Sequence, residues 1–135
     1  MKTIVVGYDG SAAAKKALER AAEFAAGGAG VTVVSAVHVL AHAGRGASGV
    51  DPVEKEERTA NLREAESLLA GKGVTHRTVE GHGDPADVIV EEAKEVSADL
   101  IIVGASGHSA PARALLGSVS TRVLHHAPCD VLVVR

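Results

Sequence analysis

The sequence predicts a single α/β domain in which a parallel sheet is covered by helices on both faces. Short, continuous apolar runs alternate with segments of helical periodicity, as doubly buried strands and their connecting helices do. The 135 residues suffice for one domain with a sizeable core, and no linker or repeat divides residues 1–135. Because crossovers between parallel strands are right-handed, only a few three-layer, doubly wound topologies remain.

The first half of the chain supplies two strands and a helix before a loop. Thr3–Val6 reads as a buried strand, which Gly7–Ser11 ends. The helix that follows has apolar residues at helical spacing, namely Ala14, Ala17, Leu18, Ala21, Ala22 and Ala25. A Gly-Gly-Ala-Gly run ends this helix. We expect Val31–Val39 to form the second strand and Ala43–Gly49 to form a loop.

The second half repeats the same alternation. The expected elements are a helix at Pro52–Ala70, a strand at Val74–Glu80, a helix at Asp84–Val96, a strand at Leu100–Val103, a helix at Ser118–His126 and a strand at Val131–Val134. The first of these helices should turn Leu62, Ala65, Leu68 and Leu69 inward. The strand at Val74–Glu80 is polar enough for a sheet edge. Asp84 suits an N-cap and Pro85 a first helical position.

Composition excludes several classes of function. One Phe, one Tyr and no Trp leave no stacking platform for single-stranded nucleic acid, and a net charge of −3 gives no basic field for a duplex.

Cys129 is the only cysteine, so no internal disulfide can form, which fits a reducing compartment. No apolar run approaches the length of a membrane span, and the N-terminal run is too short for a signal peptide. We therefore expect a cytoplasmic protein.

The most informative motif lies near the C-terminal end, where Gly104, Gly107, Gly117 and Ser118 are spaced as Gly-x-x-Gly, nine residues, Gly-Ser. The motif joins a buried strand to a helix start. Glycine lets the backbone approach a ligand closely, and a helix start offers unpaired N–H groups and a positive dipole end. Ser118 stands where a helix cap would point its hydroxyl at the ligand. The spacing therefore predicts phosphate binding.

Taken together, the motifs resemble those of the universal stress protein family, and the resemblance covers essentially the whole chain. It rests on five segments in order: Ile4–Ser11, Gly83–Pro85, Ala98–Gly104, Gly117–Ser120 and His126–Val134. The resemblance implies a Rossmann-like fold, related to the adenine nucleotide α-hydrolases, with strand order 3-2-1-4-5. It also implies the ATP-binding subclass of the family, a stress-response role and a homodimer joined through the C-terminal strand near Val131–Arg135.

The resemblance also implies a set of binding residues. Phosphate would be held by Gly104, Gly107, Gly117 and Ser118, with His108 and Val119 beside them. Asp9 would contact the ribose and help to hold a divalent ion. Mg²⁺ suits such a site because it prefers oxygen ligands and keeps several waters. Val39, which the pattern places at the end of the second strand, would meet adenine through backbone groups.

This chain departs from the family pattern inside the glycine loop. Ser106 stands between the first two glycines, where relatives often carry Arg or His. His108 occupies a position where a fixed cation is common, and a histidine is mostly neutral at pH 7. Arg113 is then the one certain cation of the loop. These departures predict weaker ATP affinity, or a preference for fewer phosphates.

Two other functions stay open at this point. One is a dimeric interaction module of the same fold that binds no nucleotide and contacts an unidentified protein partner. The other is an ATPase. Its hydrolysis of ATP should be slow, because no general base other than Asp9 and no arginine finger stands near the glycine motif. The glycine motif favours nucleotide binding over the first alternative, and steady turnover would identify the second.

Overall fold

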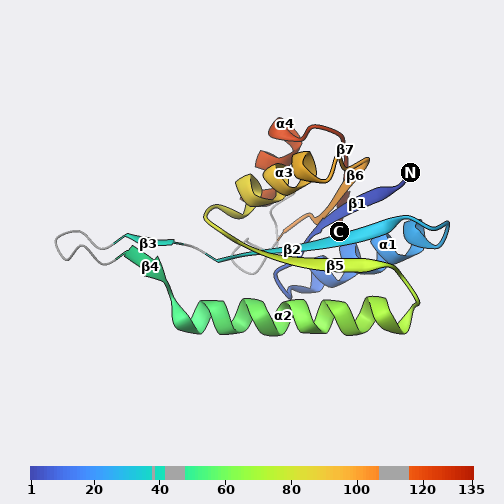
Figure 1. The fold of residues 1–135 in the computed structure, drawn as a ribbon. Coiled ribbons are helices and arrows are strands. Elements are labelled where there is room, and N and C mark those ends of the chain that lie inside the picture. The colour runs from blue at the N-terminus through green and yellow to red at the C-terminus, as the bar shows by residue number, and fades with distance from the viewer. Residues whose placement is uncertain (38, 42–47, 107–115) are drawn as a thin grey trace.

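A computed structural model describes residues 1–37, 39–41, 48–106 and 116–135 and shows helices packed on both faces of a sheet (Figure 1). The main sheet contains β1 (Thr3–Gly7), β2 (Gly30–Val37), β5 (His76–His82), β6 (Leu100–Gly104) and β7 (Asp130–Val134). The helices of the described residues are α1 (Ala12–Ala25), α2 (Pro52–Gly71), α3 (Pro85–Glu95) and α4 (Ser118–His126).

The strands of the main sheet are parallel and lie in the order β5-β2-β1-β6-β7. Numbered along the chain, these five strands give the order 3-2-1-4-5, so the predicted fold class is confirmed. From the central β1 the chain first builds outward through β2 and β5, and then crosses to the other side with β6. Ligands of doubly wound sheets bind at this kind of reversal, beyond the carboxyl ends of the strands.

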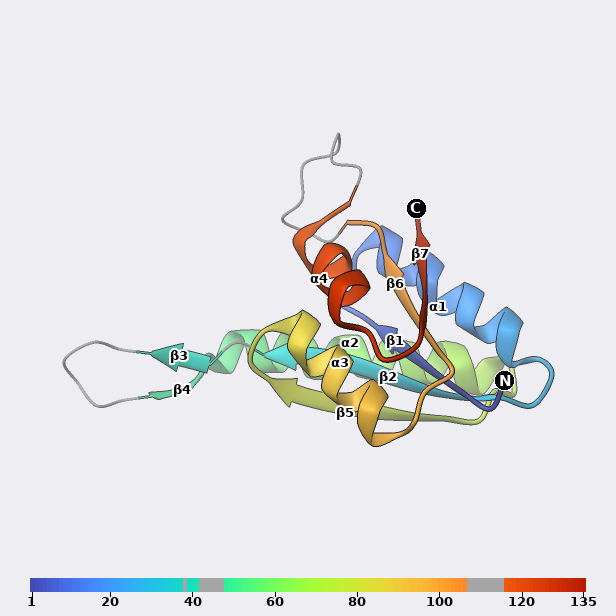
Figure 2. The same ribbon diagram turned by 90° about the horizontal axis from the view of Figure 1, so that it is seen from above.

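Helices cover the two faces in pairs. α1 packs on β1, β6 and β7, and α2 on β2 and β5, while α3 and α4 lie together on the opposite face (Figure 1, Figure 2). The core is almost entirely aliphatic, and its largest fully buried side chains include Ile4, Leu18, Leu69, Ile101 and Ile102. Tyr8 is the one aromatic residue among the buried core residues of the described ranges.

The helix patterns read from the sequence are confirmed. The six apolar positions expected on α1 are all buried, and Ser11 caps the helix by accepting a hydrogen bond from the backbone N–H of Ala14 at 3.2 Å. On α2, Leu62, Ala65 and Leu69 are buried, and Leu68 packs against them half-buried. Asp84 caps α3 as expected, accepting from the backbone N–H of Ala86 at 3.0 Å, and Pro85 is the first helical residue.

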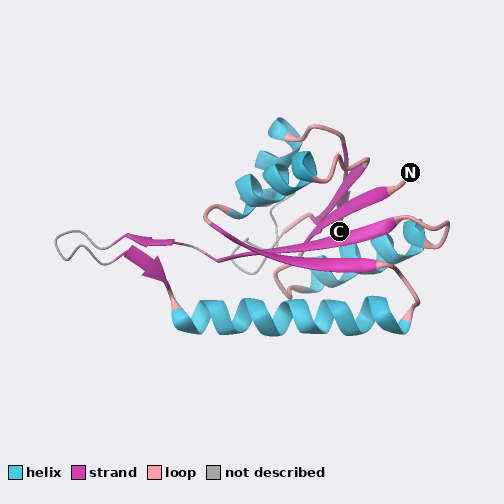
Figure 3. Cartoon of the chain, in the orientation of Figure 1, coloured by secondary structure: helices cyan, strands magenta, loops and turns pink. Residues whose placement is uncertain are grey.

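The end of the second strand differs from the prediction. β2 ends at Val37, and Val39 belongs to a separate strand, β3 (Val39–Ala41), which pairs antiparallel with β4 (Ser48–Val50) (Figure 3). The physical reason is the length of β5, because the ladder between β2 and β5 stops at the pair Val37 and His82. The segment predicted as a loop at Ala43–Gly49 therefore ends inside β4, and its residues 43–47 lie outside the described part.

The two edges of the main sheet differ in character. β5 forms one edge, as expected, and carries His76, Arg77 and Glu80. β7 forms the other edge, and its four residues after Asp130 are all aliphatic and only half-buried. Charged residues protect an edge strand against pairing with another chain, so β7 lacks the protection that β5 has.

Candidate functional site

The loop after β1 brings Asp9 to the carboxyl edge of the sheet. The Asp9 carboxylate Oδ1 accepts a hydrogen bond from the backbone N–H of Ser11 at 2.9 Å, and Ser11 in turn caps α1. Asp9 is half-buried and precedes the start of α1, where the positive end of the helix dipole favours a carboxylate. The loop thus presents an oriented carboxylate, a group that accepts hydrogen bonds from hydroxyls and binds hard cations.

Hydrogen bonds hold the start of α4 against the residue that follows β6. The backbone N–H of Gly117 donates to the carbonyl of Ala105 at 2.6 Å. The Ser120 hydroxyl lies within hydrogen-bond distance of the same carbonyl, at 3.1 Å, and of the Gly117 carbonyl, at 3.0 Å. These contacts fix the N-terminus of α4 next to β6, whose neighbour in the sheet is β1. Asp9 and the start of α4 therefore flank the same reversal of strand order.

Ser118 is the first residue of α4 and not its cap. The cap position belongs to Gly117, which is extended, at φ −78° and ψ 174°, and makes no side-chain capping bond. The proposed role of Ser118 as N-cap is therefore wrong, and its exposed side chain starts the first turn. Among the described residues no side chain caps the helix, so the first backbone N–H groups of α4 suit an anion.

The structure describes only some of the remaining members of the predicted set. Val119 is half-buried, and its side chain packs against the core under α3 and α4. Gly107 and His108 lie outside the described residues, as does Arg113. The two glycines whose positions are known, Gly104 and Gly117, stand at the two ends of the connection from β6 to α4.

Gly104 has a packing reason to be glycine. A Cβ added to Gly104 would lie 2.8 Å from the Cβ of Ala13 and 2.9 Å from its carbonyl carbon, closer than real contacts allow. The absence of a side chain therefore lets β6 approach the first turn of α1. The sequence reasoning attributed this glycine to ligand approach, and the structure supplies a different reason that is sufficient by itself.

Val39 does not have the place that the sequence reasoning assigned to it. Since β2 ends at Val37, the backbone of Val37 closes the strand, and its carbonyl accepts a hydrogen bond from the N–H of Gly83 at 2.8 Å. Val39 starts the hairpin of β3 and β4, whose only partner strands in the described residues are each other. The expectation that Val39 closes the second strand is wrong, because the ladder with β5 stops at His82. The expected contact of the Val39 backbone with adenine stays a prediction.

Residues of α2 contact the Asp9 loop, and no motif in the sequence indicates these contacts. The side-chain amide of Asn61 donates to the main-chain carbonyl of Asp9 at 3.2 Å, and the Tyr8 hydroxyl donates to the Glu64 carboxylate. Burial, reinforced by this hydrogen bond, raises the pKa of Tyr8 far above its ordinary value, so the phenol stays protonated. Both contacts join segments more than fifty residues apart, which no local pattern can indicate.

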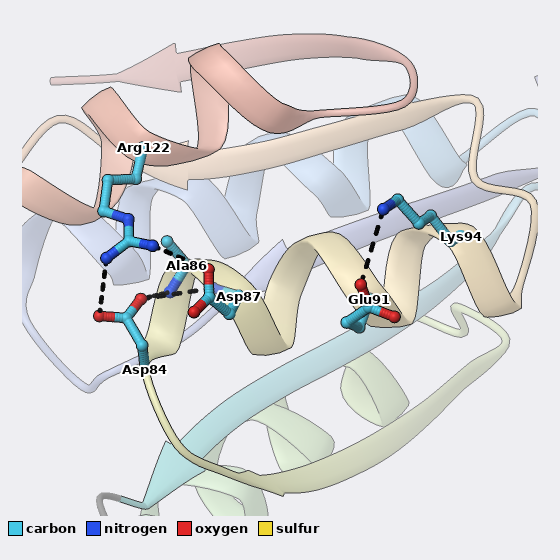
Figure 4. A network of polar contacts seen from close by, with 6 residues as sticks. All are labelled: Asp84, Ala86, Asp87, Glu91, Lys94 and Arg122. Atoms are coloured by element: carbon cyan, nitrogen blue, oxygen red, sulfur yellow. Dashed lines mark hydrogen bonds and ion pairs between the residues drawn. The ribbon is translucent and has the colours of Figure 1, made fainter.

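Arg122 is a cation on α4 that the sequence reasoning overlooked. It lies four residues after Ser118, a spacing that puts the two on one face of the helix. Its guanidinium contacts the carboxylates of Asp84 at 3.5 Å and Asp87 at 3.0 Å (Figure 4).

A cavity of about 200 Å³ lies beside these groups, lined by Ala86, Asp87, Val90, Glu91, Lys94, Arg122 and His126. The Lys94 ammonium contacts Glu91 at 3.6 Å, so the lysine and the arginine of this cavity are paired within the protein.

The described residues contain no cluster of three or more His, Cys, Asp or Glu side chains that could hold a metal ion. Asp9 is thus a single carboxylate, which fits Mg²⁺ only where phosphate oxygens and waters complete the shell. In the described part of the chain, no helix combines the length and the apolar composition that a membrane span requires.

Comparisons with known proteins place the chain in one group. The sequence model of the universal stress protein family matches residues 1–135. Universal stress protein MJ0531 of Methanocaldococcus jannaschii is 38% identical over 142 aligned residues, covering 99% of this chain and 82% of the relative. A solved universal stress protein in complex with cAMP is 35% identical, with a TM-score of 0.77 and coverage of 99% of this chain and 97% of the other. The universal stress protein from Archaeoglobus fulgidus in complex with dAMP is 29% identical, with a TM-score of 0.77 and coverage of 100% and 98%.

Proposed function

The chain belongs to the universal stress protein family, and from that premise we propose that it binds an adenine nucleotide at the carboxyl edge between β1 and β6. The observation that carries the proposal is the N-terminus of α4, which no side chain of the described residues caps. It lies beside β6, the sheet neighbour of the strand that leads to Asp9. Backbone N–H groups and a helix dipole suit phosphate, and an oriented carboxylate suits ribose hydroxyls. Two similar structures contain cAMP and dAMP, which supports an adenine ligand.

ATP with Mg²⁺ is the fuller form of this proposal. Gly117, Ser118 and Val119 would offer backbone N–H groups to the phosphates, together with Gly104, Gly107 and His108 of the preceding segment. Asp9 would contribute the one protein carboxylate to the ion. The bound ion would neutralise phosphate charge, which the paired Arg122 does not do in this arrangement. The regulatory form would be a cytoplasmic homodimer that answers stress and passes its state to a protein partner.

A second function is favoured by the packing of Gly104. Because that glycine is required for the approach of α1 to β6, its presence does not by itself indicate a ligand. A dimeric interaction module without nucleotide would keep Gly104 for the same structural reason. The start of α4 supports nucleotide binding, and the packing of Gly104 is equally compatible with the interaction module. A direct measurement of nucleotide binding distinguishes the two functions.

The test is calorimetric titration of the purified protein with ATP, ADP, AMP and cAMP, with and without Mg²⁺. We expect binding of at least one nucleotide and its loss in Asp9→Ala. Asp130→Ala is the matched control, because Asp130 is an exposed aspartate at the start of β7, away from the carboxyl edge. Mass spectrometry of small molecules released from denatured, freshly purified protein identifies a ligand that copurifies. A wild type that binds none of the four nucleotides would leave the interaction module as the function.

A further inference from the structure

Three consecutive residues of the loop after β1 contact one face of α2. Tyr8 donates through its hydroxyl to Glu64, Asp9 accepts through its carbonyl from Asn61, and Gly10 packs against the Asn61 side chain. Asn61 and Glu64 lie three residues apart, so they occupy the same face of the helix. We call these two residues the α2 clamp.

Gly10 shows how closely the loop approaches this face. Its φ of +79° lies in the left-handed region, and a Cβ there would stand 2.6 Å from the Asn61 Oδ1. Any other residue would be strained in conformation and would also collide with Asn61. The conformation of the loop after β1 therefore depends on the close approach of Gly10 to the Asn61 side-chain amide.

The clamp and the turn that Asp9 forms with Ser11 hold different atoms of Asp9. The Asp9 carboxylate Oδ1 is held by the backbone N–H of Ser11 at 2.9 Å, and the Asp9 carbonyl is held by Asn61 at 3.2 Å. Two fixed points on one residue, one on the side chain and one on the backbone, define the direction of the carboxylate. Lys15 on α1 lies 3.9 Å from the same Glu64 oxygen that Tyr8 contacts, so the clamp also reaches α1.

We propose that Asn61 is a positioning residue for the nucleotide site, one that orients the Asp9 carboxylate through the Asp9 main-chain carbonyl. The inference rests on the proposed function, since it assigns Asp9 a ligand to meet. Asn61 itself makes no contact with the nucleotide in this scheme. Its contribution is to keep the loop in the conformation that binding requires, so the free protein does not lose affinity by having to order the loop first.

The first test needs no ligand. Asn61→Leu keeps the approximate size of the side chain and removes the donor, while Asn61→Asp keeps the shape and replaces the donor by an acceptor. Hydrogen exchange of the Ser11 amide, followed by NMR, should become about tenfold faster in both variants because the turn that it closes loses its support. The control is Glu66→Leu, which removes a different contact of α2, the 2.9 Å hydrogen bond from Thr78. Unchanged exchange at Ser11 in both Asn61 variants overturns the inference.

The second test measures affinity for whichever of ATP, ADP, AMP and cAMP the wild type binds most tightly. We expect Asn61→Leu to weaken binding about five- to tenfold, the effect of one neutral hydrogen bond, and Glu66→Leu to leave it unchanged. In an Asp9→Asn background the Asn61 substitution should have little further effect, because the carboxylate that it orients is gone. Equal losses in both backgrounds would show a general structural role and refute positioning.

The two proposals fail in different ways. If the wild type binds none of the four nucleotides, the proposed function is refuted, and faster exchange at Ser11 would leave Asn61 as a structural contact without a role in binding. If the wild type binds and Asn61→Leu binds equally well, the proposed function stands and the positioning role is refuted.

Discussion

Gly104 at the end of β6 and Ala13 in the first turn of α1 pack so closely that a Cβ on Gly104 would stand 2.8 Å from that of Ala13. One of the contacting atoms in Ala13 is a backbone carbon, at 2.9 Å, which cannot move aside as a flexible side chain can. The glycine therefore sets the distance between a helix and the sheet at the edge where the candidate site lies.

Gly104→Ala should accordingly destabilise the protein by about 1–3 kcal/mol, the usual cost of overpacking a well-filled interior. Urea denaturation of wild type and variant measures the difference in the free energy of unfolding. Gly27→Ala is the matched control, because a Cβ at Gly27 meets no atom within 4 Å. If Gly104→Ala is as stable as Gly27→Ala and still loses nucleotide binding, the glycine is required by the ligand and not by α1.

Gly117→Ser should change stability and binding in opposite directions. The N-cap of α4 is extended and carries no capping side chain, so a serine hydroxyl there can accept from a first-turn N–H and add a few tenths of a kcal/mol of stability. The same N–H groups are those proposed to bind phosphate, so the new hydroxyl competes with the ligand. Thermal unfolding and calorimetric titration together check the two signs. A variant that binds nucleotide as tightly as the wild type would exclude this helix start from the site.

The parts of this fold that local patterns determine were predicted well. The buried positions of α1 and the Asp84 cap of α3 depend on residues within one or two helical turns, and both are confirmed. The end of β2 was not predicted, because it depends on where β5 stops, forty-five residues later at His82. The sequence has apolar residues on both sides of that point, so Val37 and Val39 are equivalent in any local pattern.

The candidate site shows the same division. The turn at Asp9 and the helix start near Ser118 were visible as motifs, although Gly117 took the cap position assigned to Ser118. The contact between Asn61 and Asp9 was invisible, since Asn61 lies in a charged helix without any motif, and only the packing of α2 on the sheet brings it to the loop.

Asp99 should make stability depend on pH in the acid range. Its carboxylate Oδ2 accepts hydrogen bonds from the backbone N–H groups of Lys2 at 2.7 Å and Thr3 at 3.0 Å, and these bonds hold the pKa of Asp99 below its ordinary value. A carboxyl whose pKa is lower in the folded state stabilises the protein above its unfolded pKa of about 3.9 and loses that contribution as pH falls through the folded pKa. Asp99→Asn should therefore be less stable than the wild type at pH 7, and the difference should shrink below about pH 4. Urea denaturation at several pH values checks this, and a difference that stays constant would contradict it.

The last prediction concerns the unprotected edge at β7. The carbonyl of Val134 accepts from the backbone N–H of Ala105 at 2.7 Å, so the polar backbone groups of Val134 point toward β6. Because the direction of these groups alternates along a strand, those of Val131 and Val133 point to the open edge. An aliphatic edge with free donors and acceptors favours antiparallel pairing with the same strand of a second copy, which closes on itself by two-fold symmetry. We therefore expect a homodimer.

Val133→Pro should produce a monomer or an aggregate while preserving the ladder between β6 and β7, since proline removes the N–H that faces the open edge. Leu132→Pro is the contrasting variant, because its N–H faces β6 and its loss should disrupt the fold of the chain itself. Size exclusion with light scattering should give the wild type about twice the chain mass of 13.7 kDa at tens of micromolar, and Val133→Pro the mass of one chain or of large aggregates. Circular dichroism separates the two proline variants, with native helix content expected in Val133→Pro only. A wild type that remains monomeric at these concentrations would refute the pairing of β7, and a dimer that survives Val133→Pro would place the interface elsewhere on the molecule.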